Sequence, residues 1–185
     1  MLIIEEYGVV LRQVTLDDIE MVRSWRNDPS VSKYMLFREH ISQEMQQRWF
    51  EGVCARGDLY FILNFQGEDV GLLNLKDIDP RMRMAEGGIF VVPNGLLNSH
   101  LPYRAILCLL DFAFDVLRFR RVSAHILDDN KRAIRYNESL GYKLTDASQE
   151  GGGRLYFLEK EDYDSCSAKL KKILRLNSNP LERKL

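Results

Sequence analysis

The sequence predicts a single α/β domain, and three observations support this. First, 185 residues with 45% hydrophobic content suffice for one substantial core. Second, along the chain, segments in which apolar residues recur at every second position follow segments in which they recur with the period of a helix. Third, residues 121–142 read as a strand, an acidic turn and a capped helix. We expect a mixed, mostly antiparallel sheet with helices on both faces.

Charge and composition exclude several classes of function. Lys and Arg total 26 against 27 Asp and Glu, so the net charge of −1 gives no reason to expect nucleic acid as a partner. No apolar run of about 18 residues could span a membrane. The three cysteines form no CxxC pair, and the N-terminus lacks a basic leader, so we expect a cytoplasmic protein. The three histidines are scattered, and we expect no metal site. Cys108 lies in an apolar helical run, where an inert buried thiol is expected.

The first strand is expected at 9–12, and the first helix follows it. Thr15 and Asp18 form a capping-box-like start. The helix ends at Asp28 because a residue before a proline, here Pro29, is driven out of helical geometry. Its expected buried residues are Ile19, Val22 and Trp25.

The end of this helix gathers an aromatic ring, a permanent cation and an amide in Trp25, Arg26 and Asn27. Side chains at a helix C-terminus can leave the core and line a cleft. They can equally be a core anchor beside a solvated arginine. Both interpretations remain open at this point.

Next come a second helix and a hairpin. Ser42 begins the helix, whose expected core stripe is Met45, Trp49 and Val53. Strands at 59–65 and 70–76 are joined by a turn at 66–69, and together they predict a β-hairpin.

The fourth strand, 84–92, contains two unusual features. Gly87 and Gly88 lie inside an apolar run, where glycine usually marks a bulge or a close approach of the backbone. Glu86 lies on the opposite face from Ala85 and Ile89, and points either into a cleft or to solvent. The loop that follows leads to a helix from Pro102, suited to position N1, to about Leu117.

The unit at 121–142 contains a strand with alternating residues, stopped by Asp128 and Asp129. Asn130 is a good N-cap for the next helix, and Gly141 suits a left-handed C′ position. Free amides at such a helix start suit an anion or a polar ligand, although a purely structural unit is also possible.

These residues carry a resemblance to a known family. The pattern N-x-x-A-I-x-x-x-E-x-x-G-[FY] is written here by Asn130, Ala133, Ile134, Glu138, Gly141 and Tyr142. It resembles the fourth motif of the GNAT superfamily of acyl-CoA N-acyltransferases, and the element order fits that fold from about residue 8 to 160. The resemblance implies acetyl-CoA as co-substrate and a fourth and fifth strand that are parallel and splayed.

The resemblance also implies a set of site residues. The cofactor-binding residues would be Phe90, Val91, Val92, Asn94, Gly95, His100, Arg104, Asn130, Ala133 and Asn137. Glu86 would be the base or would order a base water. The oxyanion would be held by the amide of Phe90 or Val91. Tyr136 would protonate the departing thiolate.

Two departures from the family pattern stand out. The usual pyrophosphate signature G-x-G-x-[GA] is reduced to the single Gly95, so His100 and Arg104 would compensate with charge, or acetyl-CoA would bind weakly. The family's tyrosine position holds Asn137, and Tyr136 precedes it, about 100° round the helix. A Tyr136 that faces the core is an equal alternative.

V-R-x-W-R-N-x-P at 22–29 is similar to PseH-like enzymes, which acetylate the 4-amino group of a UDP-linked dideoxy sugar. This resemblance implies an acceptor site that includes Trp25, Arg26 and Asn27. A RimJ/RimL-like protein N-terminal acetyltransferase is the second interpretation. A catalytically weak acyl-CoA-binding or scaffold domain is the third.

The last part of the chain differs in character. Two strands are expected around a turn at 151–153, which completes a domain over 1–163. Residues 164–185 are expected to form a basic tail or a short amphipathic helix. This segment could dock on the domain, dock on a second subunit in a homodimer, or fray.

Overall fold

The computed structural model describes residues 1–148 and 153–178, and these contain a single mixed sheet of eight strands. The spatial order is β1-β2-β3-β4-β5-β6-β8-β7. The strands are β1 (Ile3–Glu6), β2 (Val9–Gln13), β3 (Leu59–Phe65), β4 (Glu68–Asp79), β5 (Met84–Val91), β6 (Arg121–Leu127), β7 (Lys143–Ser148) and β8 (Gly153–Glu159). Only β5 and β6 run parallel among these strands, so the predicted α/β fold with a mostly antiparallel sheet is confirmed. The turn predicted at Gly151 and Gly152 lies outside the described residues.

β1 has no counterpart among the strands expected from the sequence. It pairs with β2 through a tight turn at Tyr7 and Gly8, both with positive φ (54° and 73°). β1 is a four-residue edge strand, and Ile3 is exposed. Such a short segment carries little alternation, so its pairing with β2 and not its local pattern makes it a strand.

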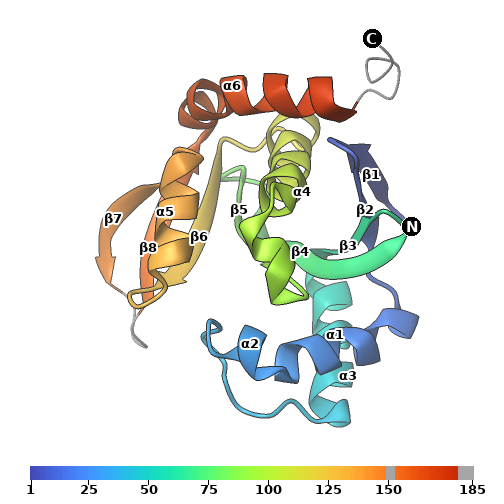
Figure 1. Cartoon of the computed structure of the whole chain (residues 1–185). Coiled ribbons are helices and arrows are strands. Elements are labelled where there is room, and N and C mark those ends of the chain that lie inside the picture. The colour runs from blue at the N-terminus through green and yellow to red at the C-terminus, as the bar shows by residue number, and fades with distance from the viewer. Residues whose placement is uncertain (149–152, 179–185) are drawn as a thin grey trace.

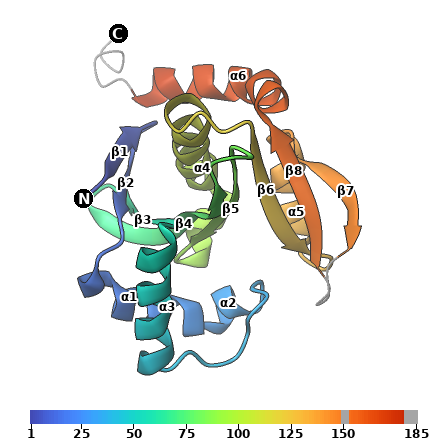
Figure 2. The same cartoon turned by 180° about the vertical axis from the view of Figure 1, so that it is seen from behind.

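The predicted splay between β5 and β6 is present. The two strands pair over only three residues, from Met84 with Arg121 to Glu86 with Ser123, and then separate. Figure 1 and Figure 2 show β6 leaving β5 and turning toward β8. The separation opens the sheet in its middle, beside the last five residues of β5.

Of the two interpretations of Gly87 and Gly88, a bulge or a close approach, the bulge is not found. The register of β5 on β4 is continuous from Glu86 to Val91, and the irregularity lies on β4 after Lys76. The glycines mark close approach instead. A Cβ on Gly88 would lie 2.6 Å from Oδ1 of Asn74, and one on Gly87 would lie 3.0 Å from Cγ1 of Val122.

The helices cover both faces of the sheet (Figure 1). They are α1 (Ile19–Asn27), α2 (Pro29–Ser32), α3 (Gln43–Arg56), α4 (Leu101–Asp111), α5 (Lys131–Ser139) and α6 (Lys160–Ser178), with shorter turns η1 (Leu16–Asp18), η2 (Asn94–Asn98) and η3 (Phe112–Val116). α1 and α3 pack on Ile62 and Leu72 on one face, whereas α4 packs on Phe61 and Leu73 on the other. Alternate residues of each central strand therefore belong to different cores.

The predicted helix boundaries are largely confirmed. Thr15 and Asp18 form a capping box, and α1 ends at Asn27, before the extended Asp28. Asn130 caps α5 by accepting from the amide of Ala133 at 3.1 Å. α4 begins one residue earlier than expected, so Pro102 is its second residue, and the helical path continues through η3 to Val116.

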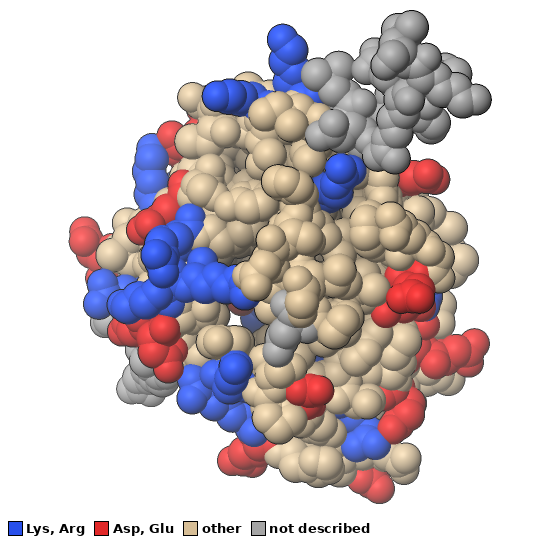
Figure 3. Space-filling model, in the orientation of Figure 1, with Lys and Arg blue, Asp and Glu red and all other residues tan. Residues whose placement is uncertain are grey.

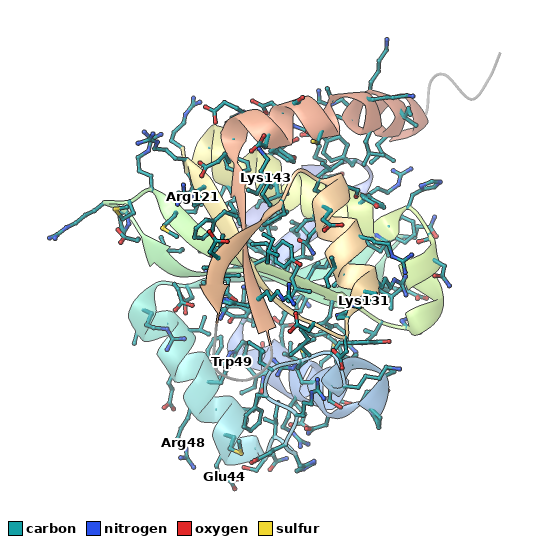
Figure 4. The ribbon with its side chains drawn as sticks, turned by 90° about the vertical axis from the view of Figure 1, so that its left-hand side faces the viewer. Glu44, Arg48, Trp49, Arg121, Lys131 and Lys143 are labelled. Atoms are coloured by element: carbon teal, nitrogen blue, oxygen red, sulfur yellow. The ribbon has the colours of Figure 1, made fainter. Side chains whose placement is uncertain are left out.

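The core stripe predicted for α3 is wrong at its first position. Met45 is exposed, and the neighbouring Gln46 is buried instead. Trp49 packs edge-on against Tyr60, with ring centroids 5.0 Å apart, and Val53 is buried. Figure 4 shows Glu44 and Arg48 projecting outward from the opposite side of the helix.

α6 lies across α4 at the top of Figure 1. It begins at Lys160, ahead of the expected boundary at residue 164, and buries Tyr163 and Leu174. The hydroxyl of Tyr163 donates to Asp111 of α4 at 2.7 Å, and Lys171 pairs with the same carboxylate at 2.6 Å. The division of the chain at residue 164 stays a prediction.

Candidate active site

A cavity of about 460 Å³ lies where β5 and β6 separate. On the side of α1 and α2 its wall is formed by polar residues of β4, β5 and β6 together with the segment after α2. On the side of α4 its wall comes from α4, α5 and the segment that follows η2. The opening in the sheet therefore connects two chambers, one on each face.

Glu86 is the centre of the polar wall. Its Oε1 lies 3.0 Å from Nζ of Lys76, and its Oε2 lies 2.6 Å from Nδ1 of His125. The register of the sheet brings these three side chains together. Lys76 on β4 is the cross-strand partner of Glu86. On β6 the partner of Glu86 is Ser123, and His125 follows two residues later on the same face. Glu86 therefore faces the cavity, and its carboxylate is paired with Lys76, not with Arg81 or Arg83.

The pairing fixes the charge of Lys76 and the orientation of His125. Burial lowers the pKa of Lys76, but the attraction of Glu86 outweighs it and raises that pKa overall. Both His125 and Glu86 have side chains that are about 85% buried, at 13% and 15% exposure. Nε2 of His125 is buried and has no hydrogen-bond partner among the described residues. His125 was not among the site residues expected from the sequence.

Arg26 alone of the expected acceptor residues lines the cavity. Its Nε is buried without a hydrogen-bond partner, and no carboxylate in the described part of the chain forms an ion pair with it. Burial lowers the pKa of this guanidinium. An arginine stays protonated in proteins, so the cavity contains an uncompensated cation.

Trp25 and Asn27 are placed elsewhere. The Trp25 ring packs edge-on against Phe90, with centroids 6.3 Å apart, in the small core under α1. The amide of Asn27 both donates to the carbonyl of Ile41 at 3.0 Å and accepts from its N–H at 2.8 Å. Asn27 thus holds the segment between α2 and α3 in place, Trp25 is part of the small core, and neither lines the cavity.

On the α5 side, Asn130, Ala133, Tyr136 and Asn137 all line the cavity. The amide of Asn137 folds back on its own helix and donates to the carbonyl of Ala133 at 2.8 Å. The hydroxyl of Tyr136 donates to the carbonyl of Pro102 at 2.7 Å. Burial, and next to it the neighbouring Tyr103, raises the pKa of Tyr136 well above its usual value.

The backbone of β5 offers amides to the opening. The N–H of Val92 donates to the carbonyl of Val70 on β4 at 2.8 Å. Because successive amides of a strand point to opposite sides, the N–H of Phe90 also points to β4, and those of Ile89 and Val91 point into the gap. Of the two expected oxyanion donors, Val91 has the suitable direction and Phe90 does not. Phe90 contributes its ring to the cavity wall.

Several of the expected cofactor-binding residues do not line the cavity: Val92, Gly95, His100 and Arg104. The side chain of Asn94 lies outside what the structure describes. His100 is exposed at the start of α4, and the guanidinium of Arg104 donates to the carbonyl of Tyr7, behind α4. Arg104 is half-buried and is directed toward β1 and β2 because α4 packs on them.

Arg132 supplies the basic group that Arg104 does not. It lines the cavity and donates to the carbonyl of Leu97 and, at 3.3 Å, to Oδ1 of Asn98. Figure 3 shows Lys and Arg side chains gathered over the lower end of α5, where Lys131, Arg132 and Arg135 are exposed. Lys131 is labelled there in Figure 4. Exposed charge at a helix start gives no sequence signal of its own, so this residue was missed.

A family model described as an acetyltransferase (GNAT) domain matches residues 9–143. The chain belongs to the GNAT acetyltransferase family. The match contains both chambers of the cavity, from α1 to α5, so the cavity is the candidate active site of an N-acetyltransferase.

Three relatives are similar to this acetyltransferase in sequence. The uncharacterized protein MJ1062 of Methanocaldococcus jannaschii is 26% identical over 149 residues, 79% of this chain and 30% of that protein. The chain thus spans less than a third of that relative. Spermidine N(1)-acetyltransferase of Escherichia coli is 26% identical over 75% of this chain and 74% of its own. Acetyltransferase PseH of Campylobacter jejuni is 21% identical over 75% of this chain and 85% of its own.

Solved structures show the same fold. FdhC, described as a nucleotide-linked sugar GNAT, superposes with a TM-score of 0.78 at 16% identity, over 94% of this chain and 98% of its own. Spermidine N-acetyltransferase from Vibrio cholerae, solved with CoA and spermine, superposes with a TM-score of 0.75 at 17% identity, over 85% of this chain and 99% of its own. The predicted GNAT fold is confirmed.

The described residues contain no group of three His, Cys, Asp or Glu side chains that could hold a metal ion. None of the described helices combines the length and apolar character that crossing a bilayer requires. Cys108 is buried, and burial raises the pKa of its thiol to about 12, as expected for an inert cysteine.

Proposed function

We propose that this acetyltransferase moves the acetyl group of acetyl-CoA to a primary amine on a nucleotide-linked aminosugar. The observation that carries the proposal is the unpaired Arg26 in the chamber on the α1 side. A buried guanidinium without a carboxylate is unfavourable in the free protein, and a ligand that brings negative charge relieves it. A diphosphate is such a ligand, and it matches the fork of N–H donors.

The charge balance of the cavity separates this acceptor from a polyamine. The charged lining residues are Arg26, Lys76, Glu86 and Arg132, with His125 as a fifth titratable group. Glu86 is the only acidic residue among the described lining residues, and Lys76 already pairs with it. A spermidine chain carries several ammonium groups and needs free carboxylates to bind them. The cavity provides none.

The segment after α2 supports a nucleotide as well. Tyr34 and Phe37 line the cavity, and both residues are exposed, at 46% and 42%. Exposed aromatic rings beside a guanidinium are surfaces on which a nucleobase can stack. The description of FdhC as a nucleotide-linked sugar GNAT supports the same acceptor class, whereas the spermidine acetyltransferases among the relatives support a polyamine.

The residues around the gap fit acetyl-CoA, which supplies the acetyl group as a thioester. The amides of Ile89 and Val91 would bind polar groups along β5, and one of them would stabilise the oxyanion. The start of α5, with Arg132 beside Leu97, would hold the negatively charged end of the cofactor. The reacting amine would enter from the chamber that contains Glu86 and His125.

An acceptor assay tests the proposal. The purified enzyme is given acetyl-CoA and, separately, a UDP-linked 4-amino-4,6-dideoxy sugar, spermidine and a peptide with a free N-terminus, and CoA release is measured. We expect the highest kcat/KM with the nucleotide sugar. Preference for spermidine would show that Arg26 does not govern acceptor choice. Preference for the peptide would favour a RimJ/RimL-like function, and CoA binding without turnover would favour the scaffold interpretation.

A further inference from the structure

The strongest unused feature of the cavity is the buried lone nitrogen of His125. Nδ1 of this ring lies 2.6 Å from Oε2 of Glu86, and Nε2 is buried without a partner in the described residues. We propose that His125 is the general base that deprotonates the acceptor amine, and that Glu86 positions it. This inference rests on the proposed transfer to an amine, but not on the identity of the sugar.

The carboxylate of Glu86 determines which ring nitrogen is free. A carboxylate accepts hydrogen bonds only, so it requires the proton of a neutral imidazole to be on Nδ1. Nε2 then presents its lone pair. The other carboxylate oxygen is held by Lys76 at 3.0 Å, which fixes the carboxylate from the opposite side.

The position of His125 on β6 directs the ring into the acceptor chamber. Val122, Ala124 and Ile126 alternate with it and pack in the large core under α4. His125 therefore lies on the other face, with Glu86 and Lys76, where the splay leaves β6 without β5 beside it. The amine and the thioester would meet at this opening.

His125 is chemically better suited than Glu86 to accept the proton. In water an imidazole is a stronger base than a carboxylate by about two pKa units, so proton transfer from an alkylammonium to it is less unfavourable. Both carboxylate oxygens of Glu86 are already engaged. A direct base role for Glu86 would remove the negative charge that holds Lys76 and His125.

The acceptor arrives as an ammonium group and gives one proton to Nε2 of His125, which leaves a lone pair on the amine nitrogen. That nitrogen attacks the acetyl carbon, the C–N bond forms and the oxyanion is held by a β5 amide. The C–S bond then breaks, the thiolate leaves, and the second amine proton neutralises it. His125 finally releases its proton to solvent.

Several charged or titratable groups face this ring. Glu86 and Lys76 approach from β5 and β4, Tyr60 lines the cavity from β3, and Arg26 lines it from α1. Tyr142 lines it from the segment after α5, and burial raises its pKa, so its phenol is neutral. The net field thus contains two fixed cations and one carboxylate, and the carboxylate is the group in contact with the ring.

The first test is kinetic. His125→Gln should lower kcat/KM by about 10²–10⁴-fold, which is the usual contribution of a general base. The affinity for CoA should be retained. The matched control is His40→Gln, since His40 is exposed and outside the cavity, and it should keep wild-type activity. In His125→Ala, added imidazole should restore part of the lost rate. Retention of more than a tenth of kcat/KM by His125→Gln at every pH would overturn the proposal.

The second test separates positioning from folding. Glu86→Gln preserves shape, but its amide can donate to Nδ1 and favour the tautomer with the proton on Nε2. We expect a loss in kcat of at least about tenfold, and an ascending limb of the pH–rate profile that is altered in Glu86→Gln and absent in His125→Gln. A Glu86→Gln profile identical to wild type would show that Glu86 does not act through His125.

A third measurement does not depend on any acceptor. With ¹⁵N-labelled histidine, the three imidazoles give a simple spectrum, and His125→Gln assigns the one of interest. We expect the Nδ1–H tautomer in the wild type and a shift toward Nε2–H in Glu86→Gln. An Nε2–H tautomer in the wild type would overturn the base assignment even if acetyl transfer is observed. The expected tautomer together with no turnover on any amine would instead refute the proposed function.

Discussion

The hydroxyl of Tyr136 donates its proton to the carbonyl of Pro102, at a distance of 2.7 Å, and so links α5 to the start of α4. The Tyr136 ring also packs against that of Tyr103, with centroids 4.8 Å apart. Burial raises the pKa of the Tyr136 phenol well above its usual value, so it is a poor donor to a thiolate. The position fits a link between two helices better than a general acid.

Tyr136→Phe should therefore affect stability more than chemistry. Removing the hydroxyl leaves the Pro102 carbonyl without this partner, and we expect the free energy of unfolding to fall by about 1 kcal/mol. We expect kcat to change less than about threefold, since no acid is lost. Urea unfolding and saturating-substrate kinetics measure the two quantities. A fall in kcat of about 10² or more would restore Tyr136 as the acid.

Arg26→Ala should weaken acceptor binding without weakening the fold. If the guanidinium binds a diphosphate, its removal should raise the acceptor KM by about 10- to 100-fold, the range for charge-assisted hydrogen bonds, and leave the affinity for CoA unchanged. Because the Nε of Arg26 is buried without a hydrogen-bond partner and the guanidinium has no counterion among the described residues, the free variant should be at least as stable as the wild type.

The control for this variant is Arg48→Ala. Arg48 projects from the outer side of α3 (Figure 4) and is exposed. Arg48→Ala should change neither the KM for the acceptor nor the KM for acetyl-CoA. A loss of stability in Arg26→Ala with an unchanged acceptor KM would show that the guanidinium has a structural role only.

Arg132→Ala should weaken acetyl-CoA binding. Arg132 is the basic side chain that lines the α5 side of the cavity, and loss of one contact to a phosphate should raise the CoA dissociation constant by about tenfold. Arg135→Ala is the matched control, because Arg135 is on the same helix and donates to the carbonyl of Lys131. Calorimetric titration with CoA measures both. Equal loss in the two variants would indicate only a general effect of positive charge on α5.

Much of the fold follows from the sequence because it depends on local signals. Asp28 before a proline and Asn130 as a cap each act over a few residues, and each is found where it was expected. The hairpin is also present, but its turn, expected at 66–69, consists of Gln66 and Gly67 only, because β4 already begins at Glu68. The face of α3 was harder to predict. Met45 and Gln46 are neighbours, and which of them faces the sheet depends on how the helix packs, which period alone does not set.

The active site depends on register, which the sequence does not reveal. Alternation along each strand places Glu86 on one face of β5 and His125 on one face of β6, but it does not state which residue lies beside which. The three paired residues of the parallel register place Nδ1 of His125 2.6 Å from Oε2 of Glu86, although the two residues are 39 positions apart in the sequence. In the same way, the amides of β5 point alternately to β4 and into the gap. Val91 can be chosen over Phe90 as the oxyanion donor only when the pairing of Val92 with Val70 is known.

A final prediction concerns Asp18, which anchors the start of α1 to β2. Its carboxylate accepts from Arg12 at 2.7 and 2.8 Å and from the amide and hydroxyl of Thr15 at 2.8 and 2.9 Å. Burial on its own raises the pKa of Asp18, but the bonds from Arg12 and Thr15 together outweigh it and lower that pKa below its usual value. A carboxylate with a lowered pKa in the folded state stabilises the fold while it is ionised.

The lowered pKa of Asp18 determines how the free energy of unfolding changes with pH. The stabilisation by Asp18 is complete above the ordinary aspartate pKa of about 4 and is lost as the pH falls through the lower, folded-state value. Asp18→Asn should therefore reduce the free energy of unfolding by about 1–3 kcal/mol at pH 7, by the same amount at pH 5, and by less only below about pH 4. Urea unfolding at pH 7, 5 and 3.5 measures this. Glu20→Gln, which removes an exposed pair with Arg23, is the control and should leave the unfolding midpoint unchanged. If the difference between wild type and Asp18→Asn already narrowed between pH 7 and 5, the carboxylate would have a raised pKa in the folded protein, and its role as the ionised anchor of α1 would be wrong.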